Sequence, residues 1–448
     1  MTLTLDAIRE CFEGVIPATM ATAAPDGIPN VAYLSQIQFV DSQHVALSYQ
    51  FFNKTRQNIL VNPRAMLSVT NPATGAQYHL SLAYMRTETS GPLFESMKAK
   101  LAGIASHTGM SGVFRLLGSD IYRVLEIRQV PGKPLPPRAP SRNLLAALRR
   151  AVERIGAAAE LEQLLTDILA CLDQQFDIRH AMILMLDAPG GRLYTVASRG
   201  YEASGVGSEI PVGHGVIGVA ARERTAIRIG HMSTEYAYSR AVRESTEQSG
   251  LSGMLESEIP LPGLAEPRSQ LAVPILAGAC MFGVLYVESP QDLRFSYDDE
   301  DALACLAGHL GMAMHKLQDA NEAGESISRP ATEPALAATG APLLVRHFQE
   351  NDSIFLDDDY LIKGVAGSIF WALLRDYSER ARTEFTNREL RVDPRVRLPD
   401  VSDNLEARLI LLNRRLLERN AGVRIDKTGR GRFRLRVDRP VRLQEAAP

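Results

Sequence analysis

A proline-rich segment at residues 130–142 constrains the fold of this chain more than any other feature. The segment, VPGKPLPPRAPSR, holds five prolines in thirteen residues. Proline fixes φ and lacks a backbone donor, so these residues form neither a helix nor a central strand. We expect a stiff, extended spacer that separates one folded unit from the next.

A second segment, at residues 320–341 (ANEAGESISRPATEPALAATGA), is small, polar and free of periodic hydrophobic residues. Such a composition is typical of a flexible tether. The chain has 448 residues, a length that suits about three domains. The two segments therefore predict folded parts at residues 1–130, 143–319 and 346–448, with linkers at 131–142 and 320–345.

Composition excludes several classes of protein. Hydrophobic residues make up 45% and charged residues 23%, as in ordinary soluble globular proteins rather than disordered or fibrous chains. The net charge of −3 gives no whole-chain attraction to nucleic acid or membrane. The four cysteines form no CxxC pair, which fits a reducing compartment. With no signal peptide and no apolar run of about 20 residues, we expect a cytoplasmic protein that does not enter the membrane.

The first part alternates short strand-like runs with turn residues such as PDG at 25–27. After a short helix at 5–12, the predicted strands cover residues 17–22, 29–40, 45–49, 65–70, 78–89 and 119–128. Six short strands with few helices predict a closed β-barrel.

Lys54 and Thr55 follow a strand that ends in hydroxyl and aromatic side chains. An ammonium and a hydroxyl, with the amides of a turn, can hold a phosphate group. Tyr49 and the nearby phenylalanines offer a ring to stack on a flat ligand. The alternative is that Lys54 and Asn58 lie on a solvated helix face.

The pattern SxxxxxKTxxNxxxNP, which begins at Ser48 and runs into a strand, resembles the FMN-binding split-barrel family of pyridoxamine-phosphate-oxidase-like proteins. The resemblance covers most of residues 1–130 and implies a split β-barrel with FMN as cofactor. The FMN contacts that it implies are Ser48, Lys54 and Thr55, with Tyr33, Tyr49, Gln50 and Asn58. The family's substrate-binding Arg/His signature is absent, so oxidation of pyridoxamine phosphate is not implied.

Haem is the alternative cofactor, because members of this superfamily also bind haem or deazaflavin. His79 and His107 are the candidate iron ligands. A histidine in a strand or loop is more often a satisfied polar residue, so FMN is the favoured cofactor.

The middle part has helices at both ends of a strand-rich centre. The predicted helices cover residues 144–176, interrupted near Ala157, and 297–318; the strands cover 181–187, 193–198, 226–229, 270–276 and 280–288. This order predicts an α+β fold typical of sensor domains. Gly213, Gly215 and Gly218 match GxGxxG, but a polar loop precedes them and no βαβ unit surrounds them, which excludes a dinucleotide site.

These glycines, with SQLAVPILAGACMFGVLYVES at 269–289, resemble the GAF family of small-molecule-binding regulatory domains over residues 143–320. The resemblance implies a bound small molecule and a homodimer formed by the terminal helices. The residues that it places at the pocket are Tyr236, Tyr238 and Arg240. The alternatives are a plain surface loop at 230–252 and helices that pack within one chain.

The last part is basic. Residues 401–448 carry twelve Arg or Lys and six acids, a net charge of +6, so the rest of the chain carries −9. Three predicted helices and the Arg-rich hairpin RIDKTGRGRFRLRV resemble the winged-helix domain of OmpR-type transcription regulators over residues 352–440. The DNA contacts that the resemblance implies are Asn404, Arg408, Arg414 and Arg415 in the third helix, and Lys427, Arg430 and Arg432 in the wing. The long link before the third helix and its aliphatic ARLILL segment leave a protein-interaction module as the alternative.

Together these patterns predict a multidomain α+β chain with an N-terminal split β-barrel, a central GAF domain and a C-terminal winged helix. We expect a signal-sensing regulator in which flavin, redox or small-molecule binding controls a DNA-binding output. No nucleophile with a base and an orienting group is evident, so a flavin-dependent oxidoreductase regulated by its GAF domain comes second. A non-catalytic interaction scaffold is the third possibility.

Overall fold

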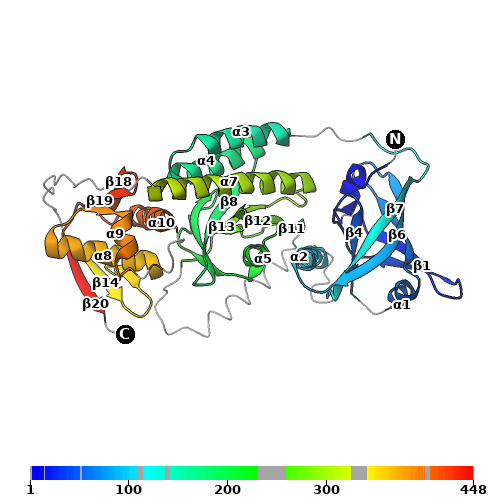
Figure 1. Cartoon of the computed structure of the whole chain (residues 1–448), viewed down its shortest axis with the longest axis horizontal. Helices are drawn as coiled ribbons and strands as arrows, with labels where there is room; N and C mark the ends of the chain where they lie inside the picture. The colour runs from blue at the N-terminus through cyan, green and yellow to red at the C-terminus, as the bar shows by residue number, and fades with distance from the viewer. Residues whose placement is uncertain are drawn as a thin grey trace.

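The computed structural model describes residues 3–14, 16–50, 53–107, 115–136, 142–230, 259–323, 341–396, 398 and 404–446. Three folded parts follow one another along the longest axis of the molecule, and we call them the barrel, the central domain and the C-terminal domain (Figure 1). Among the described residues, every helix is too short or too polar to cross a lipid bilayer.

The barrel is a seven-stranded antiparallel sheet with strand order β2-β1-β5-β6-β7-β4-β3. Its elements are η1 (Asp6–Phe12), β1 (Ala18–Ala23), β2 (Pro29–Leu34), β3 (Ile37–Phe39), β4 (His44–Tyr49), α1 (Lys54–Val61), β5 (Arg64–Thr70), β6 (Gln77–Glu88), α2 (Pro92–His107) and β7 (Gly118–Gln129). Val45, Leu67, Leu80 and Tyr122 alternate with outward residues along the strands and form the barrel core. The sheet begins at β2 and ends at β3, so it is a half-barrel that is open between these edges rather than the closed barrel predicted.

Helix α2 covers the outer face of β4 and β7. Phe94 packs there with Ala46 and Ile121 in a cluster of its own. Farther along the same helix, Ala99 packs against apolar residues of the central domain. The helix therefore touches both domains, as its position between them in Figure 1 indicates.

The central domain is a six-stranded antiparallel sheet with strand order β10-β9-β8-β13-β12-β11. Its elements are α3 (Leu144–Ala157), α4 (Leu161–Phe176), β8 (His180–Asp187), β9 (Arg192–Arg199), β10 (Glu209–Pro211), α5 (Gly215–Glu223), β11 (Ile227–Ile229), β12 (Ser269–Ala277), β13 (Cys280–Ser289) and α7 (Tyr297–Ala323). Along β8, Ile183 packs with α3, α4 and α7, whereas Met182 and Leu184 pack with α5. The sheet therefore has helices on both faces.

The apolar stripe of α3 packs against other helices of the same chain. Ala147, Ala151 and Ile155 are buried in the same core as α4 and α7. This packing matches the intrachain alternative for that stripe, and a homodimer stays a prediction.

The described residues of the C-terminal domain form two sheets and three helices. One sheet has the order β16-β15-β14-β20 and the other β17-β19-β18. The elements are β14 (Leu343–Phe348), β15 (Ser353–Leu356), β16 (Asp359–Ile362), α8 (Gly364–Arg380), β17 (Glu384–Thr386), α9 (Asn387–Val392), α10 (Leu405–Glu418), β18 (Val423–Gly429), β19 (Arg432–Val437) and β20 (Val441–Ala446). Thr386 begins α9 with a capping box that includes Glu389, which satisfies amides at the helix start.

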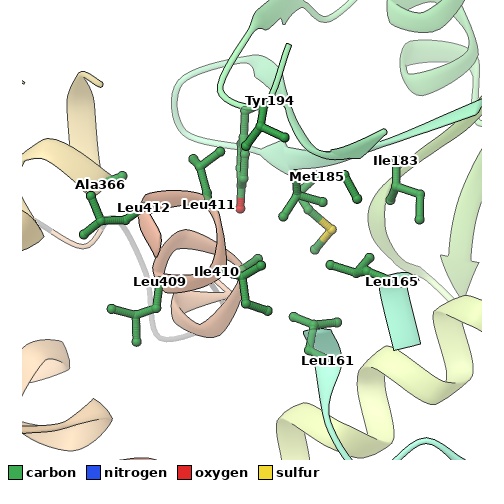
Figure 2. Close-up of a cluster of buried hydrophobic side chains, with 14 of the residues drawn as sticks. Leu161, Leu165, Ile183, Met185, Tyr194, Ala366, Leu409, Ile410, Leu411 and Leu412 are labelled. Atoms are coloured by element: carbon green, nitrogen blue, oxygen red, sulfur yellow. The ribbon is translucent and has the colours of Figure 1, made fainter. Parts of the chain in front are cut away.

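Helix α10 joins the C-terminal domain to the central domain. Figure 2 shows Leu411 of α10 beside Tyr194 of β9, and Ile410 facing Leu161 of α4. All four residues belong to one hydrophobic cluster that runs through both domains. The two domains therefore share a continuous apolar core.

Candidate functional site

Helix α1 begins at Lys54, a few residues after β4 ends at Tyr49. The side chain of Asn53 caps the helix by accepting a hydrogen bond from the Arg56 amide, 3.1 Å away. Lys54 is the first helical residue and is exposed. Its ammonium therefore stands at a positively polarised helix start, where an anionic group is favoured.

Thr55 and Asn58 hold α1 on the barrel. The Asn30 amide donates to Thr55 Oγ1 over 2.8 Å, and the Asn58 amide donates to Thr22 Oγ1 over 3.1 Å. Both side chains are buried and face β1 and β2. The structure thus assigns these two predicted ligand contacts a role in attaching the helix.

Arg56 anchors the other side of α1, a residue that sequence reasoning had not singled out. Its guanidinium lies 2.5 Å from Asp120 Oδ1, 2.9 Å from Thr87 Oγ1 and 4.4 Å from the centre of the Tyr49 ring. Burial raises the pKa of Asp120 above its ordinary value, although Thr87 and Arg56 act in the opposite direction. One face of Tyr49 is therefore already covered by Arg56.

Four buried polar residues, which we call the polar row, meet at the end of β4: Gln36, Ser48, Gln50 and Ser119. Ser48 lies opposite Ser119 in the sheet, and its amide donates to the Gln36 carbonyl over 3.1 Å. The Gln50 amide donates to Ser48 Oγ over 3.0 Å. Gln36 is 1% exposed and Ser119 0% exposed.

Several atoms of the polar row have no hydrogen-bond partner. They are both amide atoms of Gln36, the Gln50 Oε1 oxygen and the Ser119 hydroxyl. Buried polar atoms are nearly always hydrogen-bonded in folded proteins. These four atoms are therefore available to a polar ligand or to ordered water.

The polar row and Lys54 offer the kinds of group that complement the two chemical ends of FMN. Neutral amide and hydroxyl groups complement the hydroxyls of a ribityl chain and the lactam edge of a flavin ring. The Lys54 ammonium complements a phosphate, and Lys54 stands four residues beyond Gln50. Of the predicted contacts, Ser48 and Gln50 come together, whereas Tyr33 lies on edge strand β2 and is 83% exposed.

Gln36 and Ser119 were missed from the sequence, and the structure shows why. They are separated by more than eighty residues and meet only through the pairing of β4 with β7. The one local signal is that Gln36 and Gln38 alternate along a predicted strand, and Gln38 donates to Ser96 Oγ of α2 over 3.2 Å. Polar residues at alternate strand positions mark one face of a sheet.

For the haem alternative, the described residues provide no cluster of metal-ligating side chains. His79 lies half-buried on β6, paired with Ser68 of β5. Within the described residues, no group of three metal-ligating side chains is assembled. The side chain of His107 lies outside the described residues.

The glycines of the central domain shape a turn. Gly213 and Gly215 have φ values of 90° and 60°, a region that disfavours other residues. A Cβ on Gly218 would stand 2.4 Å from the Pro211 carbonyl oxygen. The glycines therefore let α5 approach the sheet. The predicted pocket residues Tyr236, Tyr238 and Arg240 lie outside the described residues.

The junction between the barrel and the central domain is a buried cluster around Tyr297, the first residue of α7. Three cations lie against its ring at 4.6, 5.1 and 4.4 Å: Arg9, Lys100 and Arg228. Arg228 bonds Glu13 over 2.7 Å and Glu300 over 2.8 Å.

Lys100 is a second buried cation of this junction. It donates to the Phe12 carbonyl over 2.9 Å. Burial and the neighbouring Arg228 lower the pKa of Lys100 to about 8. Burial in the cluster therefore favours the neutral form of Lys100 more than water does.

The junction between the central and C-terminal domains contains the arginines predicted to face DNA. Arg408 is 5% exposed; it lies 3.2 Å from Asp187 and 4.0 Å from the centre of the Tyr194 ring. Arg414 donates to the Val196 carbonyl over 2.9 Å. Both side chains face the central domain, so in this arrangement they do not face DNA as predicted.

Arg415 is also placed differently from the prediction. It is 6% exposed, donates to the Leu361 carbonyl over 3.1 Å and pairs with Glu418 at 2.8 Å. It therefore stabilises the C-terminal domain itself. The Leu361 carbonyl that it meets belongs to β16 of the same domain.

The remaining predicted DNA contacts are spread over the helix start and the hairpin. Asn404 caps α10 by accepting from the Ala407 amide over 3.1 Å. Lys427 pairs with Glu406 at 2.7 Å, and Arg430 is exposed in the hairpin turn. Arg432 lies half-buried on β19.

Comparison with known proteins identifies two parts of the chain. Residues 4–124 match the model of the pyridoxamine 5'-phosphate oxidase family, and residues 160–314 match the GAF domain model. An uncharacterized protein of Methanocaldococcus jannaschii is 43% identical over 54 residues, which are 12% of this chain and 36% of that protein. The chain thus spans about a third of that relative's length.

Solved structures resemble the same two parts. An FMN-binding protein of Syntrophomonas wolfei is 15% identical, with a TM-score of 0.25 over 29% of this chain and 86% of that one. The GAF domain of an Acinetobacter phosphoenolpyruvate-protein phosphotransferase is 22% identical, with a TM-score of 0.31 over 41% and 97%. Free methionine-R-sulfoxide reductase of Neisseria meningitidis is 18% identical, with a TM-score of 0.31 over 40% and 91%. The family matches identify a chain that joins a pyridoxamine 5'-phosphate oxidase-like domain to a GAF domain.

Proposed function

We propose that this chain is a cytoplasmic regulator that binds FMN in its barrel and a second small molecule in its central domain. Ligand binding in these two domains controls an output by the C-terminal domain. The family matches at residues 4–124 and 160–314 support the first two parts.

The observation that carries the flavin proposal is the polar row. Four polar atoms of Gln36, Gln50 and Ser119, residues that border β4, are buried without a hydrogen-bond partner. Leaving a buried polar atom without a partner costs about 1–3 kcal/mol. A ligand that supplies the missing partners recovers that free energy, which favours binding at this place.

Each end of FMN has residues to hold it. Lys54 would bind the phosphate, and the polar row would bind neutral hydroxyl or lactam groups. Bound FMN supplies reversible one- or two-electron redox chemistry. The protein residues contribute binding and orientation, because the site contains no acid or base among the polar row.

The test is an absorption spectrum of the purified chain before and after FMN is added and the excess removed. We expect the two visible bands of an oxidised flavin to be retained. Lys54→Ala and Gln36→Leu should each lose them, whereas Lys133→Ala, an exposed lysine after the barrel, should keep them. A wild-type chain that retains no chromophore contradicts the proposal and favours a scaffold; a sharp haem band contradicts it in favour of iron.

A flavin-dependent oxidoreductase differs from a sensor by turnover. If flavin is retained, repeated reduction and reoxidation with a soluble electron donor and acceptor would identify an enzyme. A single slow reduction would identify a redox sensor.

For the output, the proposal is a winged helix that contacts duplex DNA, in a homodimer. The order of three helices and an Arg-rich hairpin supports it, as does the net charge of +6 at residues 401–448. Binding of a labelled duplex should weaken with salt, and Arg430→Ala should reduce the slope of that dependence. Light scattering of the full chain tests the dimer. Salt-independent or absent binding contradicts the DNA output.

A further inference from the structure

The described ion pairs between the central and C-terminal domains have their acids on one side and their cations on the other. Among the residues that the structure describes, four pairs cross this junction, and in each the acid belongs to the central domain and the cation to the C-terminal domain. The pairs are Asp187–Arg408 at 3.2 Å, Glu160–Lys427 at 3.5 Å, Glu209–Lys363 at 3.5 Å and Glu162–Arg414 at 3.9 Å.

These acids come from separate elements of the central domain. Glu160 and Glu162 stand at the start of α4, Asp187 ends β8 and Glu209 begins β10. They are brought to one edge by the fold and not by a local acidic run. We call these four carboxylates the acidic edge.

The cations that meet the acidic edge include those predicted to contact DNA. Arg408 and Arg414 lie on α10, and Lys427 lies on the hairpin. Carboxylates placed against such cations make the same kind of contact as the phosphate oxygens of a duplex, because both are anions that accept hydrogen bonds from Arg and Lys.

We propose that the acidic edge masks a DNA-binding face of α10 and the hairpin, so that this structure is a closed state. The inference rests on the proposed DNA output and adds its regulation. Duplex DNA and the acidic edge compete for Arg408, Arg414 and Lys427, so the domains must separate before α10 reaches DNA.

Two features make the junction separable. Its charged pairs at 3.5 Å or more, which involve Glu160, Glu162 and Glu209, are partly exposed and individually weak. Small open pockets of about 60 and 20 Å³ remain where α10 meets α4, and α7 lines the smaller of the two. The apolar contact of Ile410 and Leu411 favours the closed state, and loss of the charge pairs shifts the balance toward the open one.

The test uses the full chain with the acidic edge neutralised as Glu160→Gln/Glu162→Gln/Asp187→Asn/Glu209→Gln. The control variant, Glu126→Gln/Glu153→Gln/Glu266→Gln/Asp298→Asn, changes exposed acids away from the junction by the same net charge. Affinity for a labelled duplex is measured by fluorescence anisotropy, and opening by hydrogen exchange of residues 405–418. A milder variant, Glu160→Gln/Glu209→Gln, covers the case in which the fourfold variant does not fold.

We expect the acidic-edge variant to exchange faster at 405–418 and to bind DNA about tenfold more tightly than the control variant. Equal DNA binding in both variants overturns the masking and leaves the DNA output standing. Faster exchange without DNA binding in any variant overturns both proposals. Unchanged exchange together with unchanged affinity shows a permanent junction and also overturns the masking.

Discussion

The two junctions of the central domain differ in how charge is divided between the partners. At the barrel junction each side supplies both signs: Arg9, Lys100 and Glu13 from the barrel, and Arg228, Glu300 and Asp301 from the central domain. At the C-terminal junction, the four named pairs place all acids on one side.

This difference predicts different behaviour. At the barrel junction both sides carry both charges around the buried Arg228. No outside polyanion or polycation could therefore replace one side of it. At the C-terminal junction one side supplies the acids of the named pairs. A polyanion that meets the cations can therefore replace that side. We therefore expect the barrel to stay fixed on the central domain and the C-terminal domain to be the part that detaches.

The largest effect should come from Arg228→Ala. The change leaves Glu13 and Glu300 without their buried cation, and breaking a buried ion pair from one side costs about 3–5 kcal/mol. Native-state hydrogen exchange at residues 297–303 should show a free energy of opening lower by that amount. Arg149→Ala, which removes an exposed pair with Glu153, is the control and should change it by less than about 1 kcal/mol. Similar losses in both variants would refute the barrel junction as the tighter of the two.

A smaller effect is expected for Arg408→Ala at the other junction. The substitution removes the charged contact to Asp187 and the stacking on Tyr194, and hydrogen bonds to charged groups contribute about 1.5–3 kcal/mol. Exchange at residues 405–418 should report the loss. Arg419→Ala, whose pair with Asp359 at 3.8 Å stays within the C-terminal domain, is the comparison and should leave this exchange nearly unchanged. A protection pattern that is insensitive to Arg408→Ala would mean that the apolar contacts alone hold the junction.

Local chemistry accounts for what the sequence predicted well. The proline-rich segment ends the barrel, and Thr386 starts α9 as a helix cap should. Most strands predicted for the barrel and the central domain lie within one or two residues of their observed positions, whereas the strand predicted at 29–40 divides into β2 and β3. Each of these features depends on residues within a few positions of one another. Backbone propensity and capping act at that range, so pattern reasoning reaches them.

What the sequence could not predict depends on distant partners. Ser119 completes the polar row only through strand pairing, and Arg408 is buried by a strand more than two hundred residues earlier in the chain. An arginine on a polar helix face has the same sequence pattern whether it meets water, DNA or another domain. Only the docking of α10 on the central domain separates these cases.

The barrel junction should also depend on pH through Lys100, by about 3 kcal/mol at most. The pKa of Lys100 is lowered from 10.5 to about 8, so between these values the undocked state binds more protons and docking strengthens as pH rises. Tyr297 acts in the opposite sense above pH 10, because burial raises its pKa and only the undocked ring then ionises. Thermal unfolding should therefore show greatest stability of this junction near pH 10. Lys100→Met should remove the rise below pH 10; an unchanged rise would contradict the assignment to Lys100.

The smallest expected effect is that of salt, and it separates the two junctions most directly. At 1 M salt the screening length is about 3 Å, so exposed pairs such as Glu160–Lys427 lose most of their attraction, worth less than about 1 kcal/mol each. The buried pairs of Arg228 are reached much less by ions. When salt is raised, hydrogen exchange should therefore accelerate at residues 405–418 and stay constant at 297–303. Acceleration of both segments, or of 297–303 alone, would show that the division of charge does not decide which domain detaches.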